Sequence, residues 1–96
     1  HPDIDTVFAA SDLMALGAIE AIAAAGKTGQ IRVVGFDALD DAKKAIAAGT
    51  MEASVAQFPY DMGRVAIESA VKVMRGEKLP ADINVRLELV TKENVQ

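Results

Sequence analysis

Short apolar runs that suit β-strands alternate with segments of helical character along nearly the whole chain. Each of the first three runs is followed at once by a polar residue, and the segments between the runs are rich in alanine and other helix-forming residues. This alternation is typical of a parallel sheet whose strands are joined by crossover helices. The sequence therefore predicts an α/β fold, a parallel sheet with flanking helices in the order β-α-β-α-β-α-β.

The predicted strands are Thr6–Ala10, Ile31–Phe36, Met51–Ala56 and Ile83–Val90. The first is a short apolar run, as expected of a buried strand, and the second and third are mostly apolar. The fourth alternates apolar and polar residues, which predicts one wet face and one buried face formed by Ile83, Val85, Leu87 and Leu89.

The helical segments lie between these strands, and each is followed by a glycine that suits a helix end. Gly17 lies inside the first helical segment, where glycine costs about 1 kcal/mol relative to alanine. A close approach of this helix to the sheet would explain it. The predicted helices are Leu13–Ala25, Leu39–Ile46 and Pro59–Arg75.

Charge and composition exclude several classes of function. The net charge is −4 and the ten Lys and Arg residues are scattered, so no basic surface for nucleic acid is expected. Cysteine is absent, which excludes disulfides and thiolate metal sites. The only histidine is His1, so neither a catalytic triad nor a His-rich metal site is expected. The sequence thus predicts a protein that is not an enzyme and that uses no cofactor or metal.

The chain opens on His1-Pro2-Asp3, without an initiator methionine or the features of a signal peptide. We therefore expect a mature, processed or shortened chain. No apolar run approaches the ~18 residues that a membrane-spanning helix needs.

Polar residues follow the first three predicted strands directly. They are Ser11 (with Asp12), Asp37 and Gln57. Because ligands of open parallel sheets bind beyond the carboxyl ends of the strands, these side chains are candidates for a site that grips hydroxyl groups. Simpler interpretations stand beside this one, since Ser11, Asp12 and Asp37 could act as helix caps and Gln57 could be an ordinary loop residue.

Four stretches of the sequence carry a resemblance to a known family. They are Val7–Ala18, Val33–Asp37, Ala56–Gly63 and the ending, with Gly76–Lys78 and Leu89–Val95. These stretches resemble, in order and over nearly the whole chain, the ribose-type sugar-binding proteins of ABC importers, which have the two-lobed periplasmic-binding-protein type 1 fold. The resemblance implies that the chain is the carboxy-terminal portion of such a protein.

The resemblance implies a role for each candidate residue. The family's sugar-binding aspartate corresponds to Asp37, and its glutamine at the crossing between the lobes corresponds to Gln57. Most members have asparagine where this chain has Ser11, so the identity of the sugar, ribose or a related pentose or hexose, stays open.

The resemblance also implies a division of the chain. Residues 1–57 and 88–96 would belong to the carboxy-terminal lobe, and residues 58–87 would form hinge crossings and a helix of the amino-terminal lobe. The segment would then be a fragment with one wall of the sugar cleft, and its exposed apolar surface would favour dimerisation or a domain swap. The implied hinge residues are Gln57, Phe58, Arg86 and Leu87.

The expected function is sugar binding for import, by closure of the lobes around the ligand and delivery to a membrane permease. The expected location is periplasmic or otherwise extracytoplasmic, with a lipid anchor in a Gram-positive source. The alternative is the effector-binding portion of a lactose-repressor-family regulator, which has the same two-lobed fold. The Val90–Asn94 ending favours transport. A signal peptide before His1 in the parent gene would support transport, and a helix-turn-helix would support the regulator.

Overall fold

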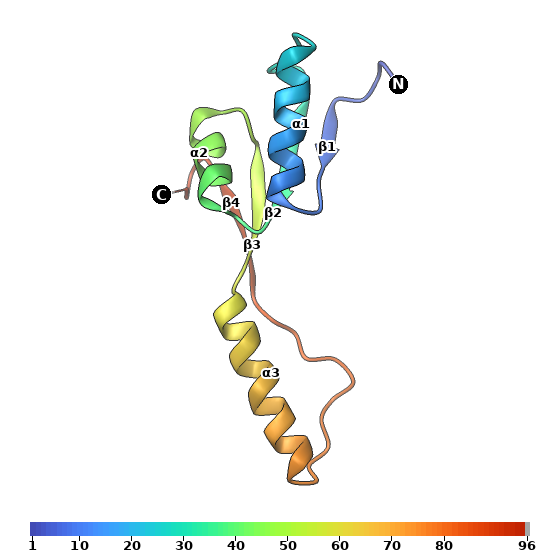
Figure 1. The fold of residues 1–96 in the computed structure, drawn as a ribbon, viewed down its shortest axis with the longest axis vertical. Helices are drawn as coiled ribbons and strands as arrows, with labels where there is room; N and C mark the ends of the chain where they lie inside the picture. Colours follow the sequence, from blue (N-terminus) through green and yellow to red (C-terminus); the bar gives the residue numbers. More distant parts are fainter. Residues whose placement is uncertain (96) are drawn as a thin grey trace. The chain divides into compact units, whose positions relative to one another are not determined.

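A computed structural model describes residues 1–95 of the chain, and in this part it contains the predicted succession of strands and helices (Figure 1). The predicted and observed elements agree to within a few residues, except at the start of the last strand. The elements are β1 (Thr6–Phe8), α1 (Asp12–Ala24), β2 (Arg32–Phe36), α2 (Asp40–Ala48), β3 (Ala53–Gln57), α3 (Pro59–Met74) and β4 (Leu87–Thr91).

The sheet has the strand order β1-β2-β3-β4. β1 and β2 pair in parallel, and so do β2 and β3, with Gly35 opposite Ser54. Helices α1 and α2 contact each other, so these two crossover helices share one face of the sheet. The predicted α/β fold is therefore confirmed, and the carboxyl ends of the first three strands lie along one edge.

The fourth strand differs from the prediction in direction and in extent. β4 enters the sheet at the end where β3 leaves it, so the two strands run in opposite directions (Figure 1). Regular pairing begins only at Leu87, and the predicted buried face is wrong because Leu87 and Leu89 are more than half exposed. Val90 is buried instead, since it packs into the core with Ile46 and Met51.

The core lies between the sheet and the pair α1 and α2. Its side chains are mostly small, with Ile46, Met51 and Val33 the largest fully buried apolar ones. The close approach expected at Gly17 is wrong, because a Cβ atom there would meet nothing within 4 Å. The tight contact lies at Gly35 in β2, where a Cβ atom would be 2.3 Å from Oδ1 of Asp12.

The described chain divides into two compact units. The first comprises His1–Gln57 together with the chain from Glu88 on, and it holds the sheet. The second, Phe58–Leu87, contains α3, none of whose residues is buried. Within this second unit the Arg86 guanidinium carbon lies 3.7 Å from the centre of the Phe58 ring, a cation–π contact. Across residues 1–95, none of the helices has the length and apolar character needed to cross a membrane.

Candidate functional site

Asp37 and Gln57 meet at the carboxyl edge of the sheet. The Asp37 amide donates to the Val55 carbonyl at 2.8 Å, which continues the pairing of β2 and β3 by one residue and sets Asp37 beside the end of β3. Gln57 Nε2 then donates to Asp37 Oδ1 at 2.6 Å. Both residues are half-buried. Two of the three predicted site residues are thus brought into direct contact.

This contact determines what the pair offers a ligand. The hydrogen bond occupies one carboxylate oxygen and one amide proton, so Asp37 Oδ2 and Gln57 Oε1 are left as acceptors. Two adjacent acceptors match the hydroxyl donors of a polyol, and hydrogen bonds to the ionised carboxylate are charge-assisted and therefore strong. The arrangement suits the binding of a neutral hydroxylated molecule.

Ser11 caps helix α1. Its Oγ accepts a hydrogen bond from the Met14 amide at 3.3 Å, so the helix-cap interpretation of this residue is confirmed. A hydroxyl that accepts in this way keeps its proton for a second partner. Among residues 1–95 no hydrogen bond joins Ser11 to Asp37 or Gln57, so a part for Ser11 in the same site stays a prediction.

Asp12 is fully buried, which the cap interpretation did not predict. Its carboxylate accepts from Ser54 Oγ at 2.7 Å and from the Leu39 amide at 2.6 Å, and both donors belong to other segments than α1. Ser54 was missed in the sequence because it stands within an apolar strand. The only available signal was a hydroxyl at a position where the strand is otherwise buried and apolar.

The cap interpretation of Asp37 is wrong. Helix α2 begins after Leu39, and no side chain caps it. Asp37 instead lies in a turn with φ = 112°, and Ala38 follows with φ = 57°. Such left-handed conformations cost non-glycine residues about 1–3 kcal/mol each and persist where the surrounding structure holds them. The turn therefore fixes the Asp37 side chain at an energetic cost to the fold.

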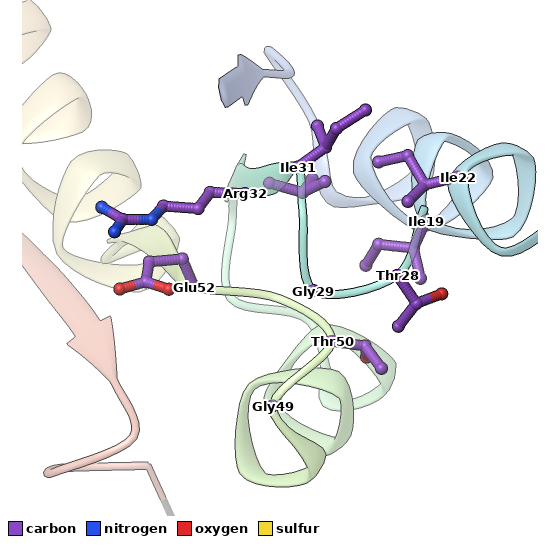
Figure 2. Close-up of a pocket in the computed structure, with 10 residues that line it drawn as sticks. Ile19, Ile22, Thr28, Gly29, Ile31, Arg32, Gly49, Thr50 and Glu52 are labelled. Carbon is purple, nitrogen blue, oxygen red and sulfur yellow. The ribbon is translucent and has the colours of Figure 1, made fainter. Parts of the chain in front are cut away.

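A separate hollow lies at the opposite edge of the sheet (Figure 2). Ile19 and Ile22 of α1, Arg32 at the start of β2, and Thr50 and Glu52 before β3 are among its lining residues. Its volume is about 150 Å³, below the roughly 300–1,000 Å³ typical of sites for small organic ligands. None of the candidate residues Ser11, Asp37 and Gln57 lines this hollow.

The family profile and similar known proteins all indicate the same family. The profile of the family described as "Periplasmic binding protein domain" matches residues 1–78. The chain is 46% identical over 93 residues to the ribose import binding protein RbsB of Escherichia coli, covering 97% of this chain and 31% of that protein. It is 41% identical over 83 residues to the D-allose-binding periplasmic protein of the same species, covering 85% of this chain and 27% of that protein.

Solved structures agree with these relatives. An ABC transporter solute-binding protein of Actinobacillus succinogenes, with bound D-allose, superposes with a TM-score of 0.82 at 34% identity. The match covers 99% of this chain and 34% of that structure. The chain thus spans about a third of the length of the proteins that it matches.

Proposed function

The chain belongs to the periplasmic binding protein domain family, and we propose that it forms one wall of the sugar cleft in a solute-binding protein of an ABC importer. The observation that carries this proposal is the Asp37–Gln57 pair, held by a 2.6 Å hydrogen bond with two acceptors left for a ligand. Ser11, at the start of α1, would add a hydroxyl to the same edge of the sheet. The sugar would be bound and released without chemical change.

The ligand would be ribose, allose or a related pentose or hexose. Relatives named for ribose and for D-allose both match most of this chain. The Ser11 hydroxyl can donate one proton while it accepts the Met14 amide, whereas an asparagine amide would offer two donors. This difference at the cleft wall would influence which sugar fits best.

The two compact units would belong to different lobes of the complete protein. His1–Gln57 and the chain from Glu88 on would lie in the carboxy-terminal lobe, and Phe58–Leu87 would supply hinge crossings and a helix of the amino-terminal lobe. The hinge would consist of Gln57, Phe58, Arg86 and Leu87, with the Arg86–Phe58 contact tying the two crossings together. Closure would then be a population shift stabilised by a sugar that touches both lobes.

The complete protein would act outside the cytoplasm and present its closed form to a membrane permease. In a Gram-positive source it would carry a lipid anchor. Each of these statements concerns the complete protein. This chain covers about a third of the length of the relatives.

A thermal melt of the full-length protein tests the proposed function. We expect D-ribose or D-allose at a hundred times its Kd to add about 2.7 kcal/mol to the free energy of unfolding. A polypeptide of these 96 residues is the matched control, and we expect no shift because it lacks the second wall. If no pentose or hexose shifts the melt of the full-length protein, the proposal is wrong.

We further predict that the isolated 96-residue polypeptide self-associates, as a dimer or by a domain swap. Ile67 and Met74 of α3 are 67% and 85% exposed, and apolar side chains of this size favour a partner. Sedimentation velocity across a range of concentrations measures the association. Ile67→Glu should weaken it, whereas Lys72→Glu on the same helix serves as the control for added charge. A strictly monomeric and cooperatively folded polypeptide at high concentration would contradict the prediction.

A further inference from the structure

Two fully buried polar side chains lie beneath the turn that carries Asp37. Asp12 opens helix α1, Ser54 lies in β3, and Ser54 Oγ donates to Asp12 Oδ1 at 2.7 Å. A buried carboxylate or hydroxyl is unfavourable unless its hydrogen-bonding groups are paired. Within residues 1–95 no buried side-chain nitrogen or oxygen lacks a partner, so this pair is satisfied.

The remaining bonds of the pair go to the backbone of the turn. The Ala38 amide donates to Ser54 Oγ at 3.0 Å, and the Leu39 amide donates to Asp12 Oδ2 at 2.6 Å. The amide of Asp37 is already bonded to the Val55 carbonyl. Three successive amides are therefore fixed, two of them by Asp12 and Ser54. This explains how Asp37 and Ala38 keep left-handed conformations that their side chains disfavour.

We propose that Asp12 and Ser54 are positioning residues for sugar binding, which act by holding the Asp37–Leu39 turn so that the Asp37 carboxylate meets Gln57. The inference rests on the proposed function. A turn that is ordered before the ligand arrives need not be ordered on binding, and this raises affinity without any contact to the ligand.

The chemistry of the pair dictates which replacements are informative. Both oxygens of Asp12 accept hydrogen bonds, one from the Leu39 amide and one from Ser54 Oγ. Asparagine has nearly the same shape, but it has one acceptor fewer, and its amide N–H would face one of these donors. Ser54 both donates and accepts, so alanine leaves Asp12 Oδ1 and the Ala38 amide unpaired. Ser54→Thr keeps the hydroxyl and is the conservative variant. Ile46→Val, in the core between α2 and the sheet, is the control for a general loss of stability.

Amide hydrogen exchange in the unliganded full-length protein tests the positioning directly. We expect Asp12→Asn and Ser54→Ala to speed exchange of the Ala38 and Leu39 amides about tenfold or more, by local opening of the turn. Ser54→Thr should restore slow exchange, and Ile46→Val should not speed these two amides selectively. Should Asp12→Asn fail to fold, Ser54→Ala with its threonine rescue makes the same test.

Sugar affinity gives the second readout. Well below the melting temperature, where every variant is folded, we expect the Kd for D-ribose or D-allose to rise about tenfold in Asp12→Asn and Ser54→Ala. Ile46→Val and Ser54→Thr should bind nearly as the wild type does. Lower stability with unchanged Kd and unchanged exchange at the turn would overturn the proposal. If the wild type binds no sugar, the proposed function fails, and the exchange rates alone decide whether the pair holds the turn.

Discussion

Replacing Asp37 by glycine in the full-length protein is expected to raise the Kd for its sugar at least about 100-fold. The substitution removes the free carboxylate oxygen and also the partner that orients the Gln57 amide. Hydrogen bonds to a charged group contribute about 1.5–3 kcal/mol each, and every 1.4 kcal/mol is about tenfold in affinity. The loss of one such bond to Asp37 Oδ2, together with the loss of a neutral bond to the misoriented Gln57 amide, worth about 0.5–1.5 kcal/mol, therefore accounts for the expected change.

Glycine is the cleanest truncation at this position because Asp37 has φ = 112°. Relief of that strain, of the order of 1 kcal/mol or more, offsets the lost bond to Gln57 and the greater freedom of glycine in the unfolded chain. The free energy of unfolding should consequently change by less than about 1 kcal/mol, as measured by urea denaturation. The substitution is thus expected to weaken sugar binding strongly while leaving the stability of the fold nearly unchanged.

Isothermal titration with D-ribose and D-allose measures the effect on binding. Asp37→Asn keeps one acceptor and tolerates the left-handed turn, so its Kd should lie between those of the wild type and Asp37→Gly. Asp41→Asn, in the exposed first turn of α2, removes the same charge away from the site and should leave Kd unchanged. Near-native affinity in Asp37→Gly would remove Asp37 from the sugar site.

The main elements of the fold could be predicted because each is specified by its own residues. Mostly apolar runs such as Ile31–Phe36 and the glycine after each helix are local signals, and they predict the order of the elements correctly. The fourth strand could not be predicted in the same way. Alternation shows which residues share a face of the strand, but it does not show which face is buried. That depends on what packs against the strand, and in the structure Val90 lies in the core whereas Leu89 is exposed.

The candidate site shows the same limit. Asp37 and Gln57 could be singled out because each is the polar residue at the end of a mostly apolar run, and parallel pairing brings such positions to one edge. The Asp12–Ser54 bond joins residues 42 positions apart, and the one local signal, a hydroxyl within a mostly apolar strand, does not name its partner. An acidic residue after Ser11 looks like a helix cap, and only the packing of α1 against β2 shows that it is buried.

The largest expected effect on stability follows from this packing. Gly35→Ala should lower the free energy of unfolding by about 3 kcal/mol, because overpacking costs about 1–3 kcal/mol and a displaced hydrogen bond to a buried charge costs about 1.5–3 kcal/mol. The added Cβ atom would lie 2.3 Å from Asp12 Oδ1 and 3.2 Å from the Ala15 Cβ atom. Asp12 would have to move away from Ser54, and α1 from the sheet.

Gly17→Ala is the matched control for this prediction. A Cβ atom at Gly17 meets nothing within 4 Å, and the residue lies inside α1. Alanine there should raise the free energy of unfolding by about 0.5–1 kcal/mol through helix propensity. Urea denaturation of the two variants therefore tests the packing directly, because glycine to alanine should lower the free energy of unfolding at Gly35 and raise it at Gly17. An equal change in the free energy of unfolding at both positions would mean that the Asp12 carboxylate does not lie over β2. It would also contradict the proposal that Asp12 positions the Asp37 turn.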